Sequence, residues 1–252
     1  MKKIISGEKI VKSFGVGDER HIVLDSVTID IHEGEFISIM GPSGSGKSTL
    51  LFVLSGMDGT DGGKVVFHDR DLSALSEKER ADILREKMGF VFQQPTFLRN
   101  LNILDNILLP SMHGKRKNAA EKNERARMLM DKVGIAELGK RSITQVSGGQ
   151  LQRAGICRAL MSSPEIVFGD EPTGALNSKT AQEIMDILSA VNAEGVTVML
   201  VTHDAKVASR TERILFMCDG KLINELKLPK YDGSDNEGRI EEVTKRMREA
   251  GI

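Results

Sequence analysis

A glycine-rich segment, GPSGSGKS from Gly41 to Ser48, lies between an apolar stretch at 36–40 and leucines at helical spacing. A glycine-rich turn between a strand and a helix lets backbone N–H groups converge on phosphate oxygens, and the helix adds its unpaired first amides and the positive end of its dipole. Lys47 could then reach the outer phosphates, and the Ser48 hydroxyl could ligate Mg²⁺. A flexible surface loop would need neither flanking element. The segment therefore predicts a nucleoside triphosphate site.

Two adjacent carboxylates, Asp170 and Glu171, end a predicted strand over 165–170. The carboxyl end of a buried strand is where ligands bind in open α/β sheets. There Asp170 can hold Mg²⁺ through water, and Glu171 can orient or deprotonate an attacking water. A solvated Asp-Glu turn is the common alternative for this dipeptide by itself. Because the pair follows an apolar strand in a chain with a phosphate loop, we favour the catalytic interpretation.

A second glycine-rich helix start lies in VSGGQLQRA, residues 146–154. Ser147 is a good N-cap, and Gly148 and Gly149 allow close backbone approach to an anion. An ordinary capped helix fits this spacing equally well. One chain thus holds two phosphate-type helix starts. A single nucleotide could use both only if they lay together in the fold or came from different subunits.

The 252-residue chain is long enough for one large domain or a domain with a substantial insertion. Its net charge of −1 gives no electrostatic support for nucleic-acid binding. No run approaches the ~18 apolar residues of a membrane span, and Ser6 and Glu8 arrive before a signal peptide could form. Cys157 and Cys218 lack metal-type spacing and lie among apolar residues, so we expect buried thiols in a reducing compartment. We therefore expect a cytoplasmic protein without direct membrane insertion.

Apolar periodicity indicates which elements position these groups. The amino-terminal part is β-rich, and HIVLDSVTIDI alternates as in a half-buried strand. Apolar residues take helical spacing from Asn102 to about Lys140, which indicates a helical insertion. Strands and helices alternate after Ser147, which indicates a mainly parallel sheet with crossover helices. The polar stretch LPKYDGSDNEG is a predicted linker to a charged helix over 238–249.

Six motifs in this order, GPSGSGKS, VFQQ, VSGGQLQR, IVFGDEP, ALNS and VTHD, resemble the ATP-binding subunit of an ABC transporter over essentially residues 3–228. The resemblance implies an α/β fold: a P-loop NTPase core with a mainly parallel sheet, an N-terminal antiparallel β subdomain and an inserted α-helical subdomain. We expect this nucleotide-binding domain over 1–228, with the helical insertion about 95–160, and a linker with a charged helix over 229–252.

The family implies a head-to-tail homodimer in which two ATP molecules lie between the phosphate loop of one subunit and the signature SGGQ of the other. The duplicated helix start is then explained, because Ser147 and the residues after it would complete the partner's site. The partners implied are a second copy and a separate integral membrane permease, which would hold the protein on the inner face of the cell membrane. No nucleic acid is expected.

The resemblance also implies a role for each matching residue, with ATP and Mg²⁺ as ligands. Phe14 stands where an aromatic residue stacks on adenine, although a core phenylalanine remains an alternative. Gln93 in VFQ matches a glutamine that touches Mg²⁺ and water, with Gln94 as the less favoured neighbour, and His203 in VTHD matches a histidine that contacts the γ-phosphate. The expected catalytic residues are Glu171, His203 and Gln93, and the expected metal ligands are Ser48, Gln93 and Asp170. The expected nucleotide-binding residues are Phe14, Gly41, Pro42, Ser43, Gly44, Ser45, Gly46, Lys47, Ser48, Thr49, Ser147, Gly148, Gly149 and Gln150.

One residue departs from the family pattern and bears on function. Asn177 in ALNS replaces the usual aspartate, which removes a charge at the expected dimer interface. The segments GVGDERHIVLDSV and DEPTGALNS resemble the branch for lipoprotein release, macrolide efflux and peptide-antibiotic resistance. The asparagine in ALNS, together with FGDEP, leans toward bacitracin- or lantibiotic-type systems. Phe97 and Leu98, just after Gln93, are expected to be exposed in a groove for a cytoplasmic helix of the permease, although packing against the core is an alternative for both.

The expected function is therefore an ATPase that powers a separate permease, in export of or resistance to peptide antibiotics. The alternatives are a lipoprotein-release or macrolide-efflux ATPase, or a low-turnover regulatory or sensor module that Asn177 keeps open. Chromosome, repair and translation ATPases of the same family carry long coiled-coil insertions, zinc modules or a second such domain, and none of these is seen in the sequence.

Overall fold

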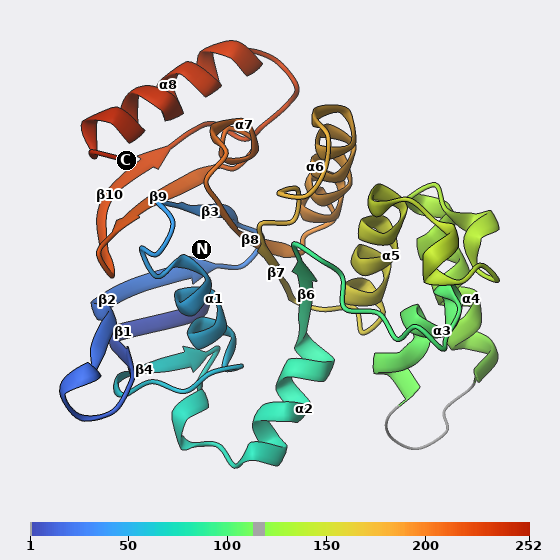
Figure 1. Ribbon diagram of the computed structural model, residues 1–252, viewed down its shortest axis with the longest axis horizontal. Coiled ribbons are helices and arrows are strands. Elements are labelled where there is room, and N and C mark those ends of the chain that lie inside the picture. The colour runs from blue at the N-terminus through green and yellow to red at the C-terminus, as the bar shows by residue number, and fades with distance from the viewer. Residues whose placement is uncertain (1, 113–118) are drawn as a thin grey trace.

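The computed structural model describes residues 2–112 and 119–252, and it holds two sheets with helix α1 (Lys47–Ser55) between them (Figure 1). The smaller sheet is antiparallel and has the strand order β2 (His21–His32), β1 (Lys3–Phe14), β4 (Gly62–Phe67) and β5 (Arg70–Asp71). Its inner apolar side chains and those of α1 share one core with the larger sheet. The predicted N-terminal antiparallel β unit is confirmed.

The larger sheet has six strands in the order β10 (Lys221–Lys227), β9 (Arg213–Cys218), β3 (Phe36–Met40), β8 (Thr197–Thr202), β7 (Ile166–Asp170) and β6 (Met88–Phe92). All neighbouring strands in it run parallel except β10, which pairs antiparallel with β9. Every residue of β3 and β8 is buried, as expected for central strands covered on both faces. The predicted mainly parallel sheet is confirmed.

Helices cover the two faces of this sheet in an arrangement that matters for the site. Phe168 and Met199 point to the face that packs on α1. Their neighbours Val167 and Leu200 point to the other face, which packs on α5 (Gly148–Leu160) and α6 (Ser178–Ala193). Successive side chains of a strand alternate between faces, so α1 and α5 lie on opposite sides of the sheet.

The helical part beyond β6 consists of α3 (Ile103–Leu108), α4 (Ala119–Lys132) and α5, which bury a core of their own. In Figure 1 this group stands apart from the small sheet. Helix α2 (Glu77–Lys87) leads into β6, α7 (Ala205–Ala208) follows β8, and α8 (Asn236–Glu249) packs on β9 and β10 at the chain end. No helix in the described ranges has the length and apolar character needed to span a bilayer.

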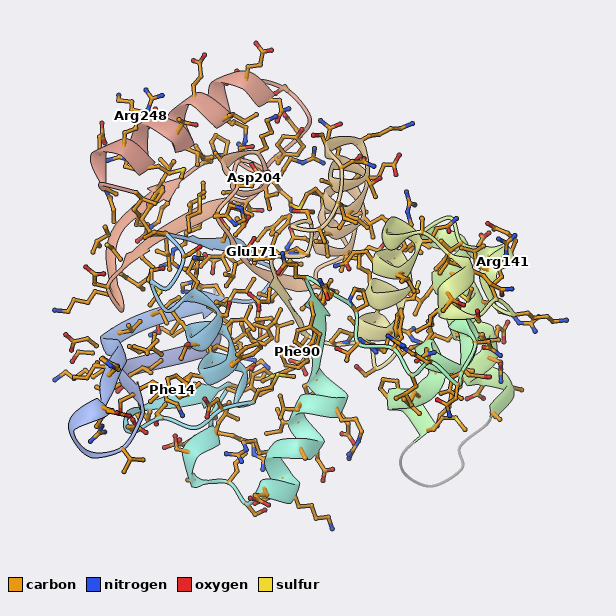
Figure 2. The ribbon with its side chains drawn as sticks, in the orientation of Figure 1. Phe14, Phe90, Arg141, Glu171, Asp204 and Arg248 are labelled. Atoms are coloured by element: carbon orange, nitrogen blue, oxygen red, sulfur yellow. The ribbon has the colours of Figure 1, made fainter. Side chains whose placement is uncertain are left out.

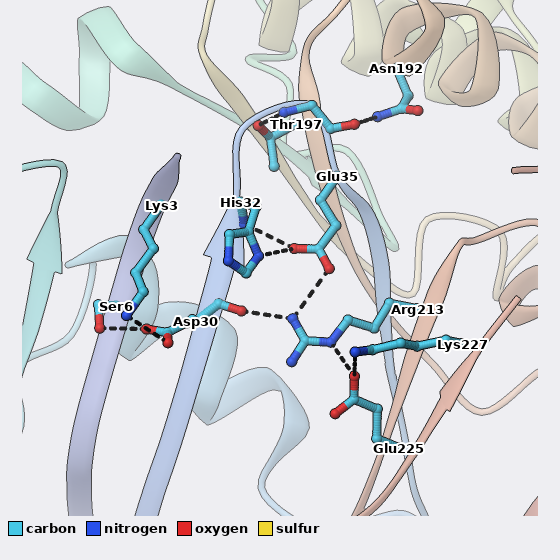
Figure 3. A network of polar contacts seen from close by, with 11 residues as sticks. Lys3, Ser6, Asp30, His32, Glu35, Asn192, Thr197, Arg213, Glu225 and Lys227 are labelled. Carbon is cyan, nitrogen blue, oxygen red and sulfur yellow. Dashed lines mark hydrogen bonds and ion pairs between the residues drawn. The ribbon is translucent and has the colours of Figure 1, made fainter. Parts of the chain in front are cut away.

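A polar network joins the two sheets at the edge opposite the phosphate loop (Figure 3). The guanidinium of Arg213 donates to the carbonyl of Asp30 (2.8 Å) and to the carboxylates of Glu35 (3.2 Å) and Glu225 (2.9 Å). Lys3 pairs with the Asp30 side chain at 2.8 Å. A largely buried guanidinium is tolerated only when its donors are satisfied, so these bonds specify how the sheets meet.

The two cysteines differ in burial. Cys157 on α5 is buried, and burial raises the pKa of its thiol to about 12. Cys218 is only half-buried at the turn between β9 and β10, so the expectation of two buried thiols is wrong for this residue. The turn brings Cys218 to the surface because the strand ends there.

Candidate functional site

The phosphate loop is held tightly by its neighbours, and its glycines are needed for that. A Cβ on Gly41 would lie 2.1 Å from the carbonyl oxygen of Met217, and one on Gly46, whose φ is +100°, would lie 2.6 Å from the carbonyl oxygen of Val23. A Cβ on Gly44 would meet nothing within 4 Å, so the loop's outer edge is open. The base of the loop is fixed and its rim is accessible to a phosphate chain.

Lys47 closes this loop on itself at the start of α1. Its Nζ donates to the carbonyl oxygens of Gly41 (2.9 Å) and Pro42 (2.8 Å). Burial lowers the pKa of Lys47, while the nearby carboxylates of Glu171 and Asp170 act in the opposite direction. The ammonium is thus poised beside the loop that would receive phosphate oxygens.

The Ser48 hydroxyl and the Asp170 carboxylate are hydrogen-bonded to each other at the end of the strand. Ser48 Oγ donates to Asp170 Oδ1 at 2.7 Å, which joins the first turn of α1 to the end of β7. Burial raises the pKa of Asp170, and the hydrogen bond from Ser48 offsets this only in part. A hydroxyl and a carboxylate side by side are the hard oxygen ligands that Mg²⁺ prefers, so this donor set fits the ion.

Glu171 and His203 form a second pair one residue further along. The backbone of Glu171 is left-handed, with φ +47°, a conformation that costs about 1–3 kcal/mol in a residue with a side chain. Its N–H bonds to the carbonyl of Val201 (2.9 Å), and its carboxylate oxygens lie 2.8 and 2.7 Å from His203 Nδ1. The strained turn therefore places the carboxylate of Glu171 against the imidazole at the end of β8.

Gln93 follows β6 and reaches the same edge. The side chains of Gln93 and Glu171 both lie against Gly174. A Cβ added to this glycine would be 2.7 Å from Gln93 Nε2 and 3.3 Å from Glu171 Oε2. The structure thus brings Gln93 next to Glu171, as expected. Sequence reasoning missed Gln152 on α5, which is buried and donates from Nε2 to the carbonyl of Phe92 at 2.9 Å. The one sign of this in the sequence was a polar residue on the helix face whose other buried residues are apolar.

Phe14 ends β1 at the rim of the small sheet, where Figure 2 shows it away from Glu171. It is 48% exposed, so the alternative of a core phenylalanine is wrong. Lys12 Nζ lies 5.2 Å from the ring centroid. An exposed aromatic ring is what stacking on a planar base requires.

The signature residues start α5, far from this group. Ser147 caps the helix, and its own N–H donates to Gln150 Oε1 at 2.8 Å in a capping box. These side chains are therefore used within the chain, and the amides of Gly148 and Gly149 are the ones without intrahelical acceptors. A Cβ on Gly149 would lie 2.4 Å from Thr180 Cγ2, which explains glycine at that position.

Asn177 connects this helix start to the segment after Glu171. Its Oδ1 accepts from the N–H of Thr180 at 2.9 Å and so caps α6. An aspartate would make the same cap, because Asn and Asp are equally good at this position. The residue's local structural role is therefore independent of the charge.

Six expected residues thus gather at the carboxyl edge of the large sheet, and one group does not. Those that gather are Lys47, Ser48, Gln93, Asp170, Glu171 and His203. The group Ser147–Gln150 begins a helix on the opposite face from α1 (Figure 1). The two helix starts of one chain therefore lie on opposite faces of the large sheet.

Comparison with known proteins gives consistent matches along most of the chain. The model of the ABC transporter family matches residues 24–174. The chain is 42% identical over 223 residues to the uncharacterized ABC transporter ATP-binding protein YknY of Bacillus subtilis, covering 87% of this chain and 95% of YknY. It is 41% identical over 220 residues to the macrolide export ATP-binding/permease protein MacB of Pasteurella multocida, covering 87% of this chain but only 34% of MacB.

Solved structures agree with the fold. The dimeric structure of the ABC transporter cassette MJ0796 of Methanocaldococcus jannaschii has a TM-score of 0.84 and 39% identity, covering 90% of this chain and 100% of that one. A dimeric post-hydrolysis state of MJ0796 bound to ADP and Pi has a TM-score of 0.83. With its phosphate loop, paired carboxylates and signature helix in these positions, the chain belongs to the ABC transporter family as an ATP-binding, ATP-hydrolysing subunit of the branch that includes MacB.

Proposed function

We propose that two copies of this chain hydrolyse ATP with Mg²⁺ at shared sites and so drive a separate integral membrane permease. The observation that carries the proposal is the placement of the two phosphate-type helix starts on opposite faces of one sheet. A second copy facing the first in head-to-tail fashion would bring the signature of one subunit to the phosphate loop of the other. The dimeric structures of MJ0796 support this arrangement.

The geometry suggests how the site would divide its work. Lys47 and the loop amides would hold the outer phosphates, and Phe14 would stack on adenine. Ser48, Asp170 and Gln93 would hold Mg²⁺, which neutralises charge on phosphate oxygens when bound. Among the described residues no three His, Cys, Asp or Glu side chains gather into a metal site.

Glu171 would accept the proton of the attacking water, with His203 orienting its carboxylate. The contacts between His203 Nδ1 and both Glu171 oxygens fix the direction of the carboxylate before any water arrives. Positioning of this kind is most of what a protein contributes to phosphoryl transfer. Because this pair is intact and Asn177 makes an ordinary cap, we favour turnover over a low-turnover sensor.

The permease would bind at a groove of about 1020 Å³ between α2, β6 and the helical insertion. Leu84, Phe90 and Leu109 line it, and Leu109 is 43% exposed. Strand β6 lines the groove and ends at Phe92, immediately before Gln93, so a segment bound there would contact the strand that carries Gln93 at its end. The permease fused in MacB supports a partner of this class.

The expectation that Phe97 and Leu98 are both exposed needs one correction. Leu98 is exposed at 49%, as expected. Phe97 is only half-buried and packs on the core of α3, α4 and α5, with the Arg158 guanidinium 4.6 Å from its ring centroid, so it belongs to the insertion rather than to a free surface. Asn106 holds the backbone of Leu98 by accepting from its N–H at 2.8 Å.

The domain assignment and location follow from the same proposal. Residues 1–228 would be the nucleotide-binding domain, with the insertion over about 95–160, and 229–252 a linker and helix. The permease would hold the subunit at the inner face of the cell membrane. Export of peptide antibiotics or resistance to them remains our proposal for the task, and the name of MacB favours macrolide efflux as the second candidate.

Replacing the proposed base tests this function directly. Glu171→Gln should keep ATP affinity but lose about 10²-fold or more of turnover, because the amide cannot accept the proton of the water. Its dimer should persist with ATP, since the closed state would form without being hydrolysed. Phosphate release and sedimentation with ATP measure both. Glu194→Gln, an exposed glutamate after α6, is the matched control, and near-normal turnover in Glu171→Gln would overturn the assignment.

A further inference from the structure

The C-terminal helix α8 lies outside the segment matched by the family model and buries an arginine against α7. Arg239 is 7% exposed, and its guanidinium donates to three carbonyl oxygens, those of Ser209 (2.7 Å), Thr211 (3.0 Å) and Pro229 (2.8 Å). Burying a charge is costly unless its donors are satisfied, so removing Arg239 leaves buried acceptors without partners. This side chain is therefore built into one specific position.

Two of these carbonyls belong to the segment that leaves α7, a helix of one turn that begins just after His203 and Asp204. Ser209 is the C-cap of α7, and both Ser209 and Thr211 are fully buried. At the other end, Asp204 caps α7 by accepting from the N–H of Lys206 at 2.8 Å. His203 immediately precedes that cap. A helix of one turn has little stability of its own, so bonds at its ends decide where it lies.

A second contact attaches the linker before α8 to the same segment. The ring of Tyr231 lies between two guanidinium groups, 4.1 Å from that of Arg210 and 5.4 Å from that of Arg239. Arg210 also pairs with Asp186 of α6. The exit of α7 is thus held from α6, from the linker and from α8, and Arg239 is the group that reaches its backbone.

We propose that Arg239 is a positioning residue for His203: by holding the carboxyl end of α7, it keeps the imidazole beside Glu171. The proposal rests on the function proposed for His203. A cation at the end of a helix is favourable, and here it also joins a helix beyond the ATPase core to the catalytic edge. Loss of this contact should shift His203 and slow hydrolysis while nucleotide binding persists.

The test combines variants of Arg239 with a variant of His203. Arg239→Gln should lower kcat about tenfold with KM for ATP nearly unchanged, because small displacements of a catalytic group cost rate rather than binding. Arg239→Lys, which keeps the charge and fewer donors, should be intermediate. Val243→Ala, at a fully buried position of the same helix without contact to the carbonyls, should lower Tm but not kcat. In a His203→Ala background, Arg239→Gln should cause no further loss.

Each other result has a defined meaning. The proposal would be overturned if the losses in the double variant were additive, or if Val243→Ala lost as much kcat as Arg239→Gln. Helix α8 would then stabilise the fold without acting specifically on His203. If His203→Ala loses turnover while Arg239→Gln does not, the proposal fails and the proposed function stands. If His203→Ala keeps full turnover, the role proposed for His203 fails and this proposal fails with it. Should Arg239→Gln not fold, Arg239→Lys carries the same comparison.

Discussion

Burial at the phosphate site disfavours the charged forms of both Lys47 and Asp170. It lowers the pKa of Lys47 and raises that of Asp170, so folding disfavours the charged form of each. Because the pKa of Asp170 in the folded state lies above its usual value of 3.8, the native state binds this proton more tightly than the unfolded chain. The free energy of unfolding therefore falls as pH rises through that range. At neutral pH the charged carboxylate of Asp170 therefore lowers the free energy of unfolding.

This cost predicts the effect of Asp170→Asn. At pH 7 the nucleotide-free variant should melt at a higher temperature than the wild type, because an amide carries no charge that burial disfavours, and the gain should disappear below the usual pKa of an aspartate. ATP hydrolysis should be lost. Scanning calorimetry across pH measures the first effect. Asp131→Asn on α4, which removes an exposed carboxylate, should change neither, and an equal shift in both variants would contradict the account.

At the scale of elements, the sequence predicted what is local. The phosphate loop, the strand before Asp170 and the cap at Ser147 were predictable because glycine turns, apolar runs and capping residues act over a few positions. The strand order was not, because parallel neighbours such as β3 and β9 are distant in sequence. Phe97 was misjudged because the packing of α3 and α4 beneath it depends on tertiary contacts.

The candidate site was predicted through family motifs more than through chemistry. No family role was assigned to Gln152 or Arg239, and nothing in the spacing of Arg239 indicated that it would bind backbone carbonyls after α7. Alternate residues of β7 pack on α1 and on α5, which places these helices on opposite faces of the sheet. Which residues face which helix depends on how all six strands are arranged, so a local pattern could not predict it. Local patterns therefore find reactive groups more easily than the residues that position them.

The groove beside β6 makes a prediction of its own. Leu109→Glu in the groove, and Leu98→Glu in the exposed segment that precedes α3, should leave the ATPase activity of the purified subunit unchanged. Both should reduce the fraction that pellets with membranes about tenfold, because burying a charge against a bound helix is costly. Met128→Glu on α4, 67% exposed and outside the groove, is the control. Wild-type membrane binding by both variants would exclude this surface as the permease site.

At the scale of the whole molecule, we propose that one chain holds halves of two different sites. The loop at α1 and the signature at α5 open on opposite faces of the large sheet, and the groove lies where β6 meets the insertion. Closure of two copies on ATP would move both insertions relative to the cores, and a permease bound in the grooves would be moved with them. The arrangement is useful only if two subunits share each nucleotide.

Complementation between two inactive variants tests that central claim most directly. Ser147→Arg should block the partner's phosphate loop, and Lys47→Ala should weaken ATP binding in its own chain, so each alone should be inactive. In a mixed dimer one shared site carries both lesions and the other carries neither. Wild-type protein titrated with Lys47→Ala calibrates the turnover of a dimer with one intact site. The account predicts that mixing the two inactive variants restores ATP hydrolysis to about a quarter of the wild-type rate, given random pairing. A mixture as inactive as either variant alone, while the calibrated mixed dimer turns over, would contradict it.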